Sequence, residues 1–322
     1  MRCLLSIIVL GIFSASIATA SADETAPLLI ANGRVDDAIA ALHGQISASP
    51  NDAMAHNLLC RAYFSVGQWD SGISECEKAV ALAPNNGQFH LWLGRIYGEK
   101  ADQSSFMTAA SLARRVGKQF EAAVQLSPQS IDAHSDLAEF YLEAPSVVGG
   151  GREKAEQQAN RLASLDPASA HWVLARIAEK HGDFGTAERE YREAINLSRG
   201  SASSWLNLGL FYKHRSQFGP MEQALSHVRS STIDRPDALV DAAEILIHTQ
   251  RNLPEAVELL HAYLNSNTKK VEQAPLFKVH YLLGSADEKL GAKEEAAAEY
   301  KTAVSMAREF RPAQEALQRM SR

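Results

Sequence analysis

The sequence is poor in the residues on which several protein classes depend. It has 3 cysteines in 322 residues, too few for a disulfide-stapled miniprotein or a multi-cysteine zinc module. Its 19 glycines and 11 prolines exclude a fibrous or linker-rich chain. It also lacks a basic excess, because 32 Lys and Arg face 38 Asp and Glu, which argues against nucleic acid as a partner. With 46% hydrophobic residues, the chain has the composition of a folded soluble protein.

Catalytic and metal-binding signatures are missing as well. The sequence contains no G-x-S-x-G nucleophile turn, no H-E-x-x-H zinc pair and no kinase signature. The acidic residues are spread at helical spacing, as they are on solvated helix faces. We therefore predict a protein that is not an enzyme and that uses no metal or other cofactor.

The N-terminus has the pattern of an export signal. Arg2 supplies a positive charge, residues 4–18 are uncharged and mostly apolar, and two small-x-small cleavage patterns follow at residues 18–20 and 20–22. The apolar run is short for a transmembrane helix, although an uncleaved anchor is the alternative. We predict a Sec-type signal peptide over residues 1–22 and a periplasmic or secreted product without stable membrane insertion.

One pattern recurs along the rest of the chain. Its fullest copy is Trp205-x2-Leu208-Gly209-x2-Tyr212, and His90-x2-Leu93-Gly94-x2-Tyr97 repeats it with His in the first position. Each copy contains two segments with apolar residues at helical spacing, separated by a short turn that contains glycine or polar residues. The prolines that close successive copies lie 34, 44, 39 and 69 residues apart, at Pro50, Pro84, Pro128, Pro167 and Pro236.

This pattern resembles the tetratricopeptide repeat, whose W-x2-L-G-x2-Y, A-x3-F and P signature spans 34 residues. The resemblance covers essentially all of residues 23–322 and is to exported bacterial members of the family. It implies an all-α fold, a right-handed superhelical solenoid of about eight helix-turn-helix repeats with a C-terminal capping helix. The expected units are 23–52, 53–86, 87–130, 131–167, 168–201, 202–236, 237–276 and 277–311, with the capping helix at 312–321.

Three segments depart from the 34-residue rhythm. The 44-residue interval predicts a lengthened second helix that begins near Ser104. The 39-residue interval adds five residues within 144–151, where a triple glycine at 149–151 either forms a turn or holds an anion on free N–H groups. No phosphate-loop pattern is present, which favours the turn. The third departure is the polar loop 265–274.

The resemblance implies a concave groove lined by the first helices, and a non-catalytic scaffold or adaptor that binds a protein or peptide in the bacterial cell envelope. Arg and Trp can anchor such a ligand while amides bond its main chain. Trp92 precedes Arg95, and Trp172 precedes Arg176, by one helical turn. A merely solvated concave face is the alternative. The candidate groove residues are Asn57, Arg61, Trp92, Arg95, Ser135, Glu139, Trp172, Arg176, Lys180, Asn207 and Lys213.

Two other functions remain open. An accessory factor for envelope polysaccharide export or assembly would hold a polymer in the same groove. Trp92 and Trp172 would favour a sugar ligand if no cations stood beside them. Self-association through the repeat ends would make a structural assembly. The identity of the partner does not follow from the sequence.

Two further residue sets have alternative interpretations. Cys60 and Cys76 occupy slots that face each other across one helical hairpin, so they form either a disulfide or two buried thiols. Near the start of the first helix of five repeats, a histidine occupies the position that the motif gives to a large residue. These histidines either pack half-buried or sense pH through titration of the imidazole. These histidines are His56, His90, His134, His171 and His280.

Overall fold

The structure, a computed structural model, describes residues 22–266 and 270–321. Nearly all of the predicted signal peptide therefore lies outside the described residues. Within them the chain contains seventeen α-helices, so the predicted all-α fold is confirmed.

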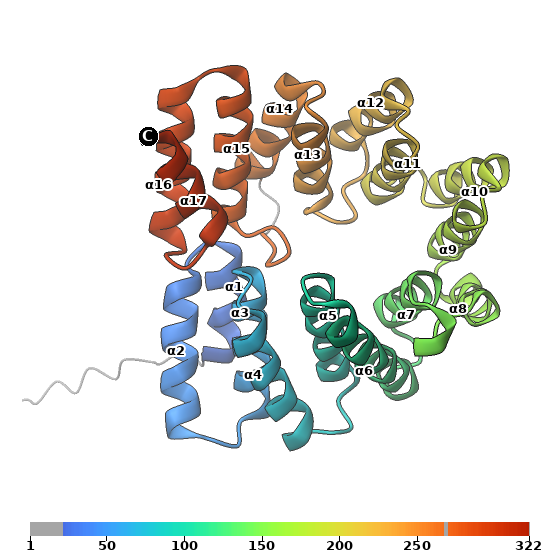
Figure 1. Cartoon of the computed structure of the whole chain (residues 1–322), viewed down its shortest axis with the longest axis horizontal. Helices are drawn as coiled ribbons and strands as arrows, with labels where there is room; N and C mark the ends of the chain where they lie inside the picture. Colours follow the sequence, from blue (N-terminus) through green and yellow to red (C-terminus); the bar gives the residue numbers. More distant parts are fainter. Residues whose placement is uncertain (1–21, 267–269, 322) are drawn as a thin grey trace, which may run out of the picture.

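The helices form antiparallel pairs, and each pair packs on the next (Figure 1). The pairs are α1 (Ala22–Ala31) with α2 (Val35–Ala48), α3 (Ala53–Ser65) with α4 (Trp69–Leu82), α5 (Gly87–Asp102) with α6 (Phe106–Leu126), α7 (Ile131–Glu143) with α8 (Arg152–Leu165), α9 (Pro167–Lys180) with α10 (Phe184–Leu197), α11 (Ala202–His214) with α12 (Phe218–Ser226), α13 (Ala238–Thr249) with α14 (Leu253–Asn265), and α15 (Leu276–Leu290) with α16 (Lys293–Met306). The last helix, α17 (Arg311–Met320), packs on α16.

Small residues let the two helices of a pair approach closely. A Cβ atom at Gly94 would lie 2.4 Å from Cε1 of Phe120 on the partner helix. At Gly284 it would lie 2.7 Å from Cδ1 of Tyr300. The recurring spacing of the motif thus places a residue without a side chain where an aromatic ring of the second helix crosses the first.

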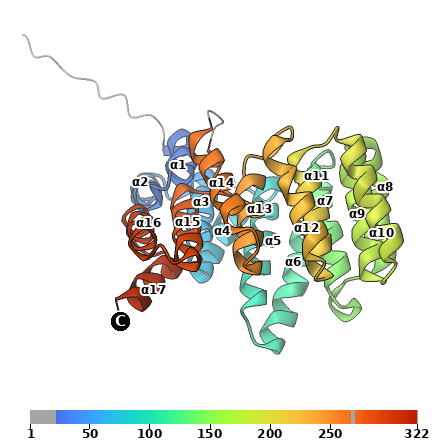
Figure 2. The same ribbon diagram turned by 90° about the horizontal axis from the view of Figure 1, so that it is seen from above.

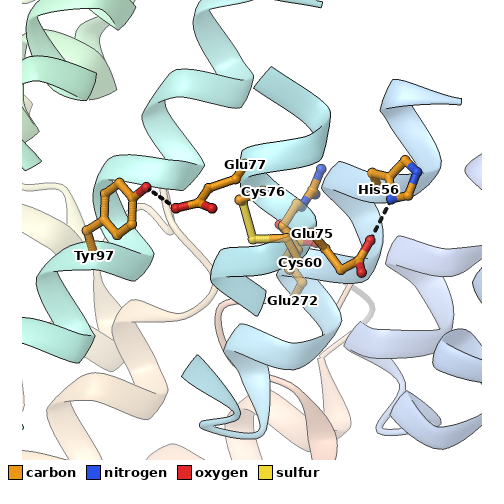
Figure 3. Close-up of a disulfide and its surroundings, with 8 residues drawn as sticks. His56, Cys60, Glu75, Cys76, Glu77, Tyr97 and Glu272 are labelled. Carbon is orange, nitrogen blue, oxygen red and sulfur yellow. Dashed lines mark hydrogen bonds and ion pairs between the residues drawn. A yellow bond between two sulfur atoms is a disulfide. The ribbon is translucent and has the colours of Figure 1, made fainter. Parts of the chain in front are cut away.

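The histidines of the first helices bond to the second helix of their own pair. Nδ1 of His56 lies 2.5 Å from a Glu75 carboxylate oxygen (Figure 3), and Nδ1 of His280 lies 2.6 Å from Glu299. His90 pairs in the same way with Gln119 across the longer α5–α6 hairpin. In the structure these rings are therefore packing and hydrogen-bonding elements that connect paired helices.

The lengthened interval is divided between two helices. α5 has 16 residues and α6 has 21, against 13 in α3 and 14 in α4. The predicted lengthened second helix is confirmed, with α6 beginning at Phe106 after Ser105 as its N-cap residue. The first helix is longer as well, because both helices of a hairpin extend together to keep their faces in contact. Both reach beyond their neighbours at one edge of the molecule (Figure 2).

The triple glycine is a hydrogen-bonded turn. After the short 3-10 segment η1 (Ser146–Val148), the N–H groups of Gly149, Gly150 and Gly151 donate to carbonyls of Ser146, Pro145 and Tyr141. A Cβ atom at Gly150 would lie 1.7 Å from the carbonyl oxygen of Ala144. These N–H groups are occupied, so the structure supports the turn rather than an anion site.

The eight pairs curve until the two ends of the chain meet (Figure 1). Ile30, Val35 and Leu59 form one buried apolar cluster with Phe277 and Ala307. The turn between α1 and α2 lies directly against the last pair, because a Cβ atom on its glycine would be 2.8 Å from the Met306 sulfur. We call this contact between the first and last pairs the seam. It closes the solenoid into a ring.

Candidate functional site

The first helices lie on the inside of the ring (Figure 1), and their charged side chains pair across neighbouring repeats. Arg95 of α5 donates from Nε to Asp136 of α7 at 2.6 Å. Lys278 of α15 lies 2.8 Å from a Glu244 oxygen of α13. Such charge-assisted contacts use the donors that a ligand would need. The inner wall is therefore partly neutralised by the protein itself.

Two predicted groove residues lie inside this wall. Asn57 is fully buried, so it does not offer an amide to a ligand in the groove, which corrects that prediction. Trp92 is 5% exposed, and the guanidinium carbons of Arg61 and Arg95 lie 5.1 and 5.3 Å from its ring centre. The Trp92–Arg95 contact that the spacing predicts is present, but the cation and the ring are both used within the protein.

The second predicted Trp/Arg pair separates. Trp172 is half-buried and packs against apolar clusters on both sides of α9. Arg176 turns to Glu139 at 2.6 Å and to Glu143 at 3.0 Å. Lys180 also pairs with Glu143, at 2.7 Å. Arg176 of α9 and Glu139 of α7, both predicted groove residues, therefore bind each other, and the predicted Lys180 binds Glu143 of α7.

Asn207 and Lys213 are placed differently. Both are half-buried on α11. Neither side chain has a hydrogen-bond or ion-pair partner among residues 22–266 and 270–321. They stay predicted groove residues.

Cys60 and Cys76 form a disulfide between α3 and α4 (Figure 3). Their Cα atoms are 5.3 Å apart, and both residues are fully buried. The bond fixes the hairpin that carries Arg61. Arg61 donates from Nε and Nη2 to a single Glu272 oxygen, at 3.0 and 2.6 Å, and so joins α3 to the segment before α15.

A cavity of about 950 Å³ opens beside the seam, and we call it the seam cavity. One wall carries Phe64, Trp69 and Trp92, with Phe64 in edge contact with both tryptophans at 5.5 and 5.6 Å. The other wall carries Tyr281 and Phe310, whose ring centres are 5.5 Å apart. Aromatic side chains from the two ends of the chain thus line a single concave space.

Charges in the seam cavity are unequally satisfied. Three cations of the cavity lining form ion pairs with carboxylates. Glu99, which also lines the cavity, has no ion pair among the described residues. Burial by the wall raises the pKa of Glu99, Asp102 raises it further, and Lys278 opposes the shift. Behind the wall, burial raises the pKa of Asp241 to about 6, with Lys278 again the leading opposing charge. The three pairs are Arg61–Glu272, Lys100–Asp70 and Lys278–Glu244.

Two buried polar atoms of residues that line the cavity have no hydrogen-bond partner in the described part of the chain. They are Nε1 of Trp92, a donor, and Oε2 of Glu272, an acceptor. The Glu272 side chain is only 10% exposed, and its other oxygen accepts both bonds from Arg61. Buried polar atoms without partners are costly, and they concentrate where a protein receives another group.

Sequence analysis did not find most of this cavity. Phe64, Trp69, Tyr281 and Phe310 are not among the predicted groove residues, although Tyr281 follows His280 as the predicted Trp172 follows His171. Phe64, Trp69 and Phe310 lie at or near a helix end. A further signal was the departure of residues 265–274 from the repeat, since Glu272 of this segment binds Arg61 near the opposite end of the chain.

None of the helices in 22–266 and 270–321 has both the length and the apolar character needed to cross a membrane. In the same ranges no group of three or more His, Cys, Asp or Glu side chains is arranged to hold a metal ion.

Comparison with known families supports the repeat geometry. A tetratricopeptide repeat model matches residues 29–90, and a second matches residues 277–310. The chain is a tetratricopeptide repeat protein. Tetratricopeptide repeats generally act as non-catalytic scaffolds for protein–protein interaction. The two matches cover the pairs that meet at the seam.

Solved structures with similar arrangements include other tetratricopeptide repeat proteins. A protein from Thermus thermophilus is 17% identical, with 62% of this chain and 99% of the other covered and a TM-score of 0.47. A protein from Parabacteroides merdae is 14% identical, with 94% and 98% covered and a TM-score of 0.46. MamA protein is 20% identical, with 57% and 91% covered and a TM-score of 0.43. Curated proteins gave no match.

Proposed function

We propose that this tetratricopeptide repeat protein is a non-catalytic scaffold that holds a segment of a partner protein in the seam cavity. One observation carries the proposal. The seam cavity is a concave space of about 950 Å³ with aromatic side chains on both walls. Pockets of this size with aromatic anchors and a few polar groups suit the side chains of a bound peptide.

The rest of the inner wall is less suited to this role. Its arginines and lysines already bind carboxylates of neighbouring repeats. A ligand would have to displace these contacts, and their loss would offset what it gains. Half-buried Asn207 and Lys213 offer free polar groups, and we propose them as secondary contacts for a ligand that extends beyond the cavity.

We place the scaffold in the bacterial cell envelope, as a periplasmic or secreted protein. The N-terminal 22 residues support this proposal with a positive charge, an apolar run and a small-x-small cleavage pattern. A buried disulfide between Cys60 and Cys76 also suits an oxidising compartment. Mass spectrometry of the N-terminus of the protein from its native host tests it, and an intact Met1 contradicts export with cleavage.

Polysaccharide binding and end-to-end assembly have weaker support. Trp92 is buried beneath two guanidinium groups and half-buried Trp172 packs against two apolar clusters, so neither tryptophan stands free to stack on a sugar ring. The apolar surfaces of the two ends pack on each other at the seam, so they are not available for end-to-end contacts.

A blocked cavity tests the proposal. Gln273 is exposed and lines the seam cavity, so Gln273→Trp should fill part of the space without disturbing the core. We expect crosslinked partners recovered from native periplasm with the parent protein to be lost with this variant. The matched control is Gln157→Trp, at an exposed position of α8 away from the cavity. Equal capture by all three proteins would show that the partner binds elsewhere.

A further inference from the structure

The charges in and behind the wall of the seam cavity leave a surplus of carboxylate. Lys278 is held between Glu244, its ion-pair partner at 2.8 Å, and the nearby Asp241. It is also the only nearby cation that opposes the shift of Glu99 among the described residues. This ammonium group therefore lies near three carboxylates from two different helices, and it shares Asp241 with Arg235, whose Nη2 lies 3.2 Å from an Asp241 oxygen. At neutral pH the region attracts another positive charge.

The other cations of the cavity do not cancel this surplus. Arg61 and Lys100 are occupied by Glu272 and Asp70, at 2.6 and 2.9 Å. Arg311 is exposed at the rim, where Glu309, also exposed, stands two residues before it. Glu309 and Arg311 offset each other, so among the described lining residues the unpaired charge that remains is the carboxylate of Glu99, whose side chain is exposed at the cavity.

A second, independent observation points to a ligand with hydrogen-bond donors. Glu272 lines the cavity, and its Oε2 is buried and accepts nothing in the described part of the chain. A guanidinium or ammonium group carries donors only, so it would satisfy an acceptor of this kind after a small opening of the wall.

The aromatic walls favour the same chemistry. Phe64 and Trp69 lie on one side and Tyr281 on the other, each half-buried with part of its surface facing the cavity. An aromatic face attracts a cation through its quadrupole, and it also packs on the apolar stem of a lysine or arginine. An anionic side chain would meet Glu99 and gain nothing from the rings.

We propose that the seam cavity is selective for a basic residue, lysine or arginine, in the bound segment. The inference rests on the proposed function, since it names the chemistry of the partner at that same cavity. Whole-chain charge agrees with it, because the formal net charge is -6 and a basic partner would be steered toward the protein.

A displayed library of short random peptides, selected on the immobilised full chain, tests the chemistry. The same selection on the Gln273→Trp variant gives the background that does not depend on the cavity. We expect the peptides lost on the blocked variant to be enriched in Lys and Arg. Cavity-dependent peptides with no charge bias, or with Asp and Glu enriched, overturn the selectivity while leaving the scaffold proposal intact. Absence of any cavity-dependent peptide overturns both.

A charge-neutral variant separates the local effect of Glu99 from net charge. Glu99→Gln should weaken binding of a selected basic peptide about threefold, and high salt should shrink the difference. Glu153→Gln changes net charge equally at an exposed site on α8. Fluorescence anisotropy with one labelled peptide measures both. If the two variants bind equally, Glu99 does not recognise the cation. Free arginine amide, added at the concentration of an unlabelled competitor peptide, should displace the labelled peptide if the basic side chain alone is enough for binding.

Discussion

Arg61 on α3 and Glu272 before α15 are 211 residues apart and share two hydrogen bonds to one carboxylate oxygen. Their side chains are 19% and 10% exposed, so solvent screens the pair only weakly. The contact lies next to the apolar seam of Phe277 and Ala307 with the first helices. It links the two ends of the ring and borders the seam cavity at the same time.

Glu272→Gln should loosen the seam. The substitution leaves the Arg61 guanidinium largely buried without a counter-charge, and we expect a loss of about 2 kcal/mol in the free energy of unfolding. Urea unfolding measures the loss, and small-angle X-ray scattering should show a larger radius of gyration. Asp37→Asn is the control at the same end, because its pair with Arg34 is 56% and 63% exposed and should contribute under about 0.5 kcal/mol. Equal effects of the two variants would mean that Arg61–Glu272 does not hold the ring closed.

Gly209→Leu should destabilise the pair of α11 and α12. A Cβ atom at Gly209 would lie 2.5 Å from Cδ2 and 2.9 Å from Cγ of Leu225, so a leucine has no room. Overpacking of this kind costs about 1–3 kcal/mol, measured by thermal or urea unfolding. Gly219→Ala on α12 is the control, since nothing lies within 4 Å of a Cβ atom there. A melting temperature unchanged in the Gly209 variant contradicts the close approach.

The disulfide should stabilise the α3–α4 hairpin. Cys60 and Cys76 are 16 residues apart, and closing a loop of this length contributes about 3 kcal/mol in the chain-entropy account. The double variant Cys60→Ala with Cys76→Ala should lose about that much, and a reducing agent should then have no further effect. Thiol titration of the unfolded, unreduced chain lacking residues 1–22 should find no reactive thiol. Two reactive thiols would show that the bond does not form.

The contribution of Asp241 to the free energy of unfolding should fall as the pH rises from about 4 to 6. Burial, Asp237 and Glu244 raise its folded pKa from 3.8 to about 6, against the opposing charges of Lys278 and Arg235. The folded state therefore holds a proton that the unfolded chain has already lost across this window, and the proton's stabilising effect is gone above it.

Asp241→Asn removes this titration. Relative to the parent, the variant should gain stability as the pH rises through the window, by about 1 kcal/mol once solvent screening of a side chain that is 34% exposed is allowed for. Urea unfolding at a series of pH values measures the difference. Glu153→Gln, at an exposed position, should follow the parent profile. Parallel profiles for Asp241→Asn and the parent would place its pKa near the ordinary value.

Local rules predicted the repeats because their causes are local. The small slot at Gly209 in the Trp205 to Tyr212 motif marks a close helix crossing, and the structure has that crossing against Leu225. The same rules allowed Cys60 and Cys76 to face each other without deciding whether they bond. They placed Trp92 beside Arg95 correctly, since an i, i+3 pair shares one face of a helix.

The sequence by itself determined the helical pairs and the order in which they stack, because helical period, turn residues and small slots act within one or two repeats. Only the tertiary structure decided which charges remain free. The carboxylate that neutralises Arg176 belongs to Glu139, 37 residues away, and the one that neutralises Arg61 lies at the opposite end of the chain. Closure of the ring depends on the total rotation that accumulates from one repeat to the next, and no single repeat determines this total. The seam cavity exists because this accumulated rotation brings the first and last pairs together.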